Sequence, residues 1–207
     1  MSTLQALLAF IGAATILAIT PGLDTALVLR SAAAGGPRRA AYAAIGISVG
    51  CLIWGAAVSV GLGALLAASR LAYTIVRWAG AAYLLWLGVR LIAAPRERFD
   101  SGGDGTADLP SGAFLRQGLL TNILNPKIGV FYVTFLPQFV PANANVALFS
   151  FLLAVIHVLL SAIWFAVLIS ATVPMGRLLK RPRVVRTMDR VAGVVFVGFG
   201  ARLALAK

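Results

Sequence analysis

Apolar residues dominate six stretches of the chain, and short polar or basic segments separate them. A helix that crosses a bilayer core of about 30 Å needs about 20 predominantly apolar residues, and each stretch is long enough. The pattern predicts membrane-spanning helices over residues 4–29, 40–68, 71–94, 114–139, 146–173 and 187–206. The remaining polar insertion, residues 95–112, is rich in Gly, Asp and Arg and predicts a loop.

The first and fourth stretches are each interrupted by a proline next to polar residues. The interrupting runs are Thr20-Pro21-Gly22-Leu23-Asp24 and Asn122-Ile123-Leu124-Asn125-Pro126-Lys127. A helix in lipid gains nothing from a freed backbone group or a charge, because each must find a partner where water is absent. Broken helices at matching places in two halves of a membrane protein indicate a binding site between the halves.

Composition agrees with a protein of the bilayer. Of 207 residues, 60% are hydrophobic and 12% are charged, which leaves no segment that resembles a soluble domain. The mean hydropathy is +0.94. No Lys or Arg precedes the first apolar stretch and no small-residue cleavage motif ends it, so we expect it to remain as the first span.

The net charge of +12 comes from basic residues beside the predicted spans, which argues for a role in orientation and against nucleic-acid binding. The segments after spans 1, 3 and 5 carry Arg30, Arg38, Arg39, Arg96, Arg98, Arg177, Lys180, Arg181, Arg183, Arg186 and Arg190. The segment after span 2 has Arg70 alone, and residues 137–145 have none. The positive-inside rule then predicts that the odd-numbered loops are cytoplasmic and that both termini face outward.

Spans 3 and 6 share a sequence pattern. Arg77-Trp78-Ala79-Gly80 and Gly88-Val89-Arg90-Leu91 correspond to Arg190-Val191-Ala192-Gly193 and Gly200-Ala201-Arg202-Leu203. Spans 1 and 4 share the proline break, so we expect two three-span repeats, residues 1–94 and 113–207, joined by a cytoplasmic loop at 95–112. An odd number of spans inverts the second copy in the membrane. Chance similarity between helices rich in Gly and Ala is the alternative.

Asp24 is the leading candidate for chemistry. Pro21 removes a helical donor and Gly22 loosens the chain, so a half-helix can begin near Leu23 with Asp24 in its first turn. The positive end of the helix dipole favours a carboxylate there, whereas burial opposes its charge. Such a group can exchange protons or pair with an ammonium. The alternatives are a charge that reaches the interface or one that pairs with Arg30.

Asn122 and Asn125 are three residues apart and share a helix face. Their amides can satisfy the carbonyl that Pro126 frees, or they can bind a ligand. Lys127 can bind a substrate carboxylate or act as the counter-ion of Asp24. The alternative is that this cluster only repairs its own break. We assign substrate or proton binding to Thr20, Pro21, Gly22, Asp24, Asn122, Asn125, Pro126 and Lys127.

Four further polar residues are weaker candidates. His157, Ser161 and Trp164 fall on one face of span 5, where the histidine is a proton relay or a hydrogen-bonded packing residue. Gln138 follows Pro137 and is expected at the outer mouth. Gly46 and Gly50 predict close helix packing, and the single cysteine, Cys51, predicts a small packing residue.

No enzyme motif, metal-ligand cluster or nucleotide-binding loop is present in the sequence, so we expect neither catalysis nor a cofactor. Two alternatives to a transporter of organic solutes stay open. A carrier of an inorganic cation could use Asp24, although one acid beside a lysine argues against a divalent metal. A membrane scaffold would use the glycine faces but has no need of Asp24 or Lys127.

The motifs, in their order along the chain, resemble the LysE/RhtB family of amino-acid exporters. The similar segments are Thr20-Pro21-Gly22 with Asp24, Gly36 with Arg38 and Arg39, Gly46 with Gly50, Gly80-Ala81-Ala82-Tyr83-Leu84, Asn122 with Asn125-Pro126-Lys127, and Phe135-Leu136-Pro137-Gln138-Phe139. The Asn-Pro-Lys run followed by Pro-Gln-Phe is the most specific of them. Where the family usually has Pro-Gly-Pro in the first span, this chain has Leu23 in place of the second proline.

The resemblance implies an all-α protein of the bacterial inner membrane, with six helices in two inverted repeats and helices 1 and 4 broken by proline. It implies efflux of an amino acid or derivative, such as threonine, homoserine, homoserine lactone, leucine or lysine, in exchange for protons. The partners are then the amino acid, protons and the lipid bilayer. Oligomeric state stays open, a homodimer included.

Overall fold

The described part of the chain, residues 2–68, 70–96, 110–179 and 181–205 of the computed structural model, is helical and contains no strand. Most of the predicted loop at 95–112 lies outside the described residues. The elements are α1 (Thr3–Ile19), α2 (Leu23–Ala68), α3 (Arg70–Ala93), α4 (Ser111–Ile123), α5 (Pro126–Val130), the π-helix η1 (Phe131–Phe135), the 3₁₀-helix η2 (Leu136–Phe139), α6 (Val146–Ser170), α7 (Thr172–Leu179) and α8 (Pro182–Leu205).

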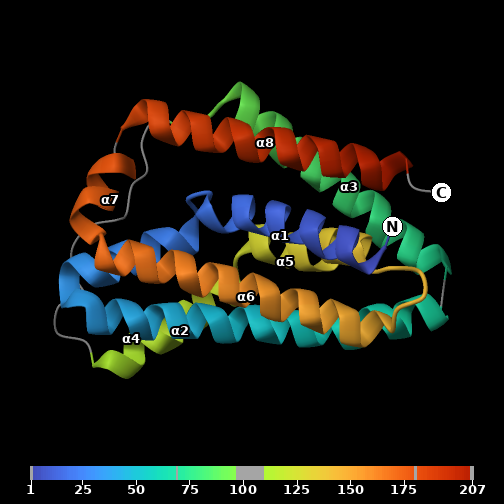
Figure 1. The fold of residues 1–207 in the computed structure, drawn as a ribbon, viewed down its shortest axis with the longest axis horizontal. Coiled ribbons are helices and arrows are strands. Elements are labelled where there is room, and N and C mark those ends of the chain that lie inside the picture. The colour runs from blue at the N-terminus through green and yellow to red at the C-terminus, as the bar shows by residue number, and fades with distance from the viewer. Residues whose placement is uncertain (1, 69, 97–109, 180, 206–207) are drawn as a thin grey trace.

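The helices form three layers (Figure 1). One outer layer is the pair α3 and α8, and the other contains α2, α4 and α6, which pack on each other through α2. Between them lie α1 and the segment from α5 to η2. Both termini lie at one end of the bundle, whereas α7 lies at the opposite end. Because α1 and α5, which adjoin the two breaks, lie in the middle layer, the breaks are enclosed by helices on both sides.

The number of membrane spans can be compared with the six that the sequence predicts. Within the described residues, Gly35–Gly61 and Val146–Ser170 are each long and apolar enough to cross a membrane. Two bent pairs, Thr3–Ile19 with Leu23–Ala33 and Ser111–Ile123 with Pro126–Phe139, raise the total to four if each pair is one span. α3 and α8 are not among these candidates, although Trp78–Ala93 within α3 is a shorter apolar helix.

The two broken spans bend at the predicted residues and by similar angles, 50° in the first and 52° in the fourth. A further kink lies at Gly36, whose φ of 75° belongs to a backbone region that side chains with a Cβ avoid. Pro37 follows it inside α2. The structure therefore joins the first and second spans by a kinked helix where the sequence suggested a basic loop.

Glycines bring the helices of the outer layers into close contact. A Cβ on Gly46 of α2 would overlap the carbonyl of Leu115 in α4, and a Cβ on Gly118 of α4 would overlap the carbonyl of Ala43. In the other layer, added Cβ atoms on Gly88 and Gly193 would each lie 2.7 Å from the other's carbonyl oxygen. The predicted role of Gly46 in close packing is confirmed.

Large apolar side chains cover much of the outer surface. Val60, Leu148 and Ile163 are 74%, 73% and 64% exposed, respectively, and many others on the outer layers are similar. In water so many exposed apolar groups would favour association, whereas in a bilayer the hydrocarbon solvates them. The interior is aromatic near η1 and η2, where Phe10, Phe131, Phe135 and Phe139 are buried in contact.

Candidate substrate site at the two helix breaks

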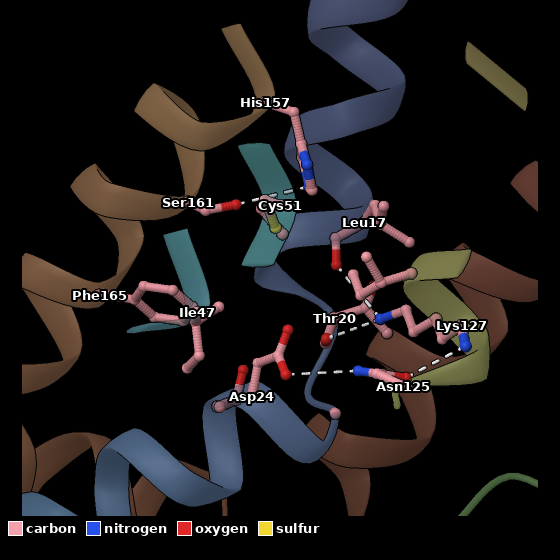
Figure 2. Close-up of a pocket in the computed structure, with 14 residues that line it drawn as sticks. Leu17, Thr20, Asp24, Ile47, Cys51, Asn125, Lys127, His157, Ser161 and Phe165 are labelled. Carbon is pink, nitrogen blue, oxygen red and sulfur yellow. Dashed lines mark hydrogen bonds between the residues drawn. The ribbon is translucent and has the colours of Figure 1, made fainter. Parts of the chain in front are cut away.

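The carboxylate of Asp24 lies between the two breaks. It stands in the first turn of α2, as predicted, and accepts hydrogen bonds from two amides of the fourth span. Asn122 Nδ2 is 2.9 Å from Asp24 Oδ2. Asn125 Nδ2 is 3.4 Å from Asp24 Oδ1 (Figure 2). The predicted candidates from sequence positions about 100 residues apart therefore meet, and amides hold the acid rather than Arg30.

Lys127, which follows the second break, bonds to the backbone at the first break. Its Nζ lies 3.3 Å from the carbonyl oxygen of Leu17 and 3.2 Å from that of Thr20 (Figure 2). These carbonyls end α1, where the helix dipole is negative and favours a cation. The sequence suggested that Lys127 could be the counter-ion of Asp24, but the ion pairs of the described residues do not include these two side chains. The side chain instead repairs the break of the other span.

Asn125 serves both breaks. Its Oδ1 accepts a hydrogen bond from the backbone N–H of Lys127 at 3.1 Å and so caps α5, while its Nδ2 reaches Asp24. Pro126 at the first position of α5 needs no such partner, since it has no N–H. The asparagine thus repairs its own break, which is one of the two alternatives that the sequence left open, and it also contacts the acid of the other break.

A small cavity of about 30 Å³ adjoins the Asp24 carboxylate. It is lined by Leu17, Ala18, Thr20, Gly22, Asp24, Thr25, Ile47, Cys51, Asn125, Lys127, Ile128, His157, Ser161 and Phe165. A volume of this size holds about one or two water molecules, not an amino acid. A transport site here must therefore enlarge to accept an organic solute.

Cys51 and its neighbour on α2 shape one wall of this cavity. Cys51 is buried, as expected, and its Sγ lies 3.3 Å from Asn122 Nδ2. A Cβ added to Gly50 would lie 2.6 Å from Asn122 Oδ1. Gly50 is therefore what allows Asn122, which is completely buried, to approach α2 and reach Asp24.

The weaker candidates divide into two groups. His157 and Ser161 line the cavity from α6 (Figure 2), and the ring of His157 lies between the Tyr132 hydroxyl, 3.0 Å from Nδ1, and the Ser161 hydroxyl, 3.4 Å from Nε2. The histidine is thus hydrogen-bonded and also faces the cavity. Trp164 packs elsewhere, near the Phe165–Leu168 cluster, and Gln138 donates to the Thr134 carbonyl. Neither lines the cavity.

Sequence reasoning missed an ion pair beside the first break. Arg96, just after α3, pairs with Asp189 of α8 through Nε and Nη2. Its Nη2 also lies 2.8 Å from the carbonyl oxygen of Pro21. Asp189 is fully buried, although the sequence shows it between Arg186 and Arg190 as part of a basic run. Its position inside the predicted sixth span was the one available signal.

Comparisons with known proteins identify the family of the chain. A model of the LysE type translocator family matches residues 15–207. An uncharacterized membrane protein of Bacillus subtilis is 32% identical, covering 98% of this chain and all of the relative. A leucine efflux protein of Klebsiella pneumoniae is 32% identical over 95% and 93% of the two chains, and a homoserine/homoserine lactone efflux protein of Salmonella typhi is 28% identical over 96% of each. No solved structure matches.

Proposed function

This chain belongs to the LysE type translocator family, and we propose that it exports an amino acid or close derivative in exchange for protons. Two relatives of nearly the same length carry the names leucine efflux protein and homoserine/homoserine lactone efflux protein. Threonine and lysine remain further members of the substrate class to be tested. The membrane potential can drive such export, since moving one charge through 100 mV supplies about 2.3 kcal/mol.

One observation carries the proposal: a carboxylate sits at a helix break inside the bundle and is held by amides. Asp24 accepts from Asn122 and Asn125, and neither amide can neutralise its charge. A proton or the ammonium of an amino acid can do so, and the two ligands would then exclude each other. Mutually exclusive binding at one acid is the least that proton-coupled exchange requires. His157 and Ser161 could pass protons to the cavity from the opposite wall.

The proposal includes two inverted three-helix repeats with the arginine-rich end in the cytoplasm. Support for the repeat comes from the similar bends of the first and fourth spans and from the reciprocal glycine contacts in both outer layers. Support for the orientation comes from both termini lying at the end opposite α7 (Figure 1). With basic residues on the α7 side, the positive-inside rule directs that side to the cytoplasm.

The test replaces Asp24 by Asn, which keeps the shape and removes the titrating group. Accumulation of labelled amino acids in everted vesicles is measured with and without a proton gradient, and membrane abundance is measured for each variant. We expect gradient-driven transport to be lost while the protein stays inserted. Asp24→Glu keeps the charge and is expected to retain part of the activity. Normal transport with normal proton dependence in Asp24→Asn would show that Asp24 is structural.

A further inference from the structure

A second pocket, of about 400 Å³, lies on the other side of the first break. It is lined by Thr20, Pro21, Gly22, Leu23, Ala26, Leu87, Leu91, Arg96, Asn125, Lys127 and Phe196. It shares Thr20, Gly22, Asn125 and Lys127 with the small cavity at Asp24. The two spaces therefore share a wall at the break, and this one falls in the size range of small-molecule sites.

The polar part of this pocket is positive. Among the described residues, Lys127 and Arg96 line it and no acidic residue does. Asp189 offsets the charge of Arg96 from behind and fixes the guanidinium at the pocket rim, where it also binds the Pro21 carbonyl. The remaining positive charge favours a carboxylate, and a ligand with an additional cationic group would be repelled.

The part of the lining that comes from α3, α8 and the start of α2 is apolar. Leu87 and Leu91 contribute from α3 and Phe196 from α8, and Leu23 and Ala26 face them from the start of α2. The hydroxyl of Thr20, the side chain best placed to bind a hydroxylated ligand, already donates to the Ile16 carbonyl at 2.6 Å. A polar substituent here would lose its hydrogen bonds to water without replacement, whereas a hydrocarbon side chain would gain from burial.

We propose that this pocket binds a neutral amino acid with an aliphatic side chain, oriented across the break. Its carboxylate faces Lys127 and Arg96, its ammonium faces Asp24 past Gly22, and its side chain lies against Leu87, Leu91 and Phe196. A Cβ on Gly22 would lie 3.7 Å from Lys127 Nζ, in van der Waals contact, so the glycine leaves space next to the lysine ammonium that a side chain would fill. The inference rests on the proposed amino-acid export and adds the location and the side-chain class.

The test measures accumulation by everted vesicles of leucine, homoserine or lysine, each supplied outside at the same concentration in separate assays. Leu91→Trp fills the pocket, and Val89→Trp is its matched control, because Val89 lies on the same helix, is 56% exposed and does not line the pocket. We expect the unmodified protein to prefer leucine over lysine by at least about tenfold. Leu91→Trp should lose leucine transport by a similar factor, and Val89→Trp should retain it.

A second substitution guards against a folding defect in Leu91→Trp. Leu91→Ala enlarges the pocket, so transport should shift from leucine toward phenylalanine, and Val89→Ala should leave the ratio unchanged. Equal transport of lysine and leucine, or the same response to substitution at both positions, would overturn the pocket assignment while leaving amino-acid export intact. Transport of no amino acid by the unmodified protein would overturn the proposed function as well.

Discussion

Replacing Arg96 by Met removes the two side-chain hydrogen bonds that Arg96 Nε and Nη2 donate to Asp189. The Asp189 carboxylate then stays buried in α8 without its arginine partner. Breaking a buried pair by removing one partner costs about 3–5 kcal/mol, because the remaining charge has no compensation. The backbone N–H of residue 96 stays 3.0 Å from Asp189 Oδ2, so the lower end of that range applies. We therefore expect a loss of about 3 kcal/mol in the free energy of unfolding.

The opposite replacement, Asp189→Leu, should cost less. The Arg96 side chain is 39% exposed whereas that of Asp189 is fully buried, so a solitary arginine can reach water and a solitary aspartate cannot. Arg96 also keeps its bond to the Pro21 carbonyl. The double variant removes both charges and should recover most of the loss, as replacement of buried ion pairs by apolar residues often does.

The unfolding midpoints of the three variants are measured by thermal unfolding of the detergent-solubilised proteins. For a chain of this length, a loss of about 3 kcal/mol lowers the midpoint by about 6–12 °C. We expect Arg96→Met to have the lowest midpoint, Asp189→Leu an intermediate one, and the double variant one close to that of the unmodified protein. If Asp189→Leu is the least stable, or if the double variant is no better than Arg96→Met, the account based on an unpaired buried carboxylate is wrong.

Three more outcomes test other parts of the molecule. Reporter fusions after Arg39 and Arg183 should both report cytoplasm, and a periplasmic signal from either would overturn the proposed orientation. Lys127→Ala should reduce efflux at least about tenfold. It should also lower the free energy of unfolding by about 1–3 kcal/mol, since two carbonyls at the end of α1 lose their donor. Unchanged efflux would exclude Lys127 from the substrate path. Gly46→Leu should prevent stable insertion because it collides with the α4 backbone, whereas Gly12→Leu, with open space around Gly12, should be tolerated.

The sequence was sufficient to select candidate residues that lie together at the two breaks, because its signals are local. A proline beside a charge in an apolar stretch is recognisable without any tertiary information, and both breaks occur where Pro21 and Pro126 predict them. Asp24, Asn122 and Asn125 were selected as unusual residues for a span, and they meet in the structure. Membrane burial makes such residues conspicuous, since each polar group there requires a partner.

The partners themselves could not be predicted, because partner choice depends on how the spans pack. Lys127 binds the carbonyls of the first span rather than the acid that its charge suggested. Asp189 escaped notice because it lies within a basic run of the sequence. Its partner, Arg96, comes from the end of another helix. The irregular η1 and η2 that complete the fourth span also lack a recognisable sequence pattern.

The two breaks are connected by bonds of different kinds, and this difference matters for the proposed exchange. Lys127 holds the end of α1 through neutral carbonyls, so its bonds do not depend on the charge of the site. Asp24 holds the asparagines through a carboxylate, and a proton or an ammonium on that carboxylate takes up acceptor capacity and weakens those bonds. Neutralising Asp24 therefore loosens the bonds between Asp24 and the two asparagines, while the bonds of Lys127 to the α1 carbonyls stay intact. A cavity that must enlarge to accept an amino acid would then open where the ligand binds, which links occupancy of the acid to movement of both breaks.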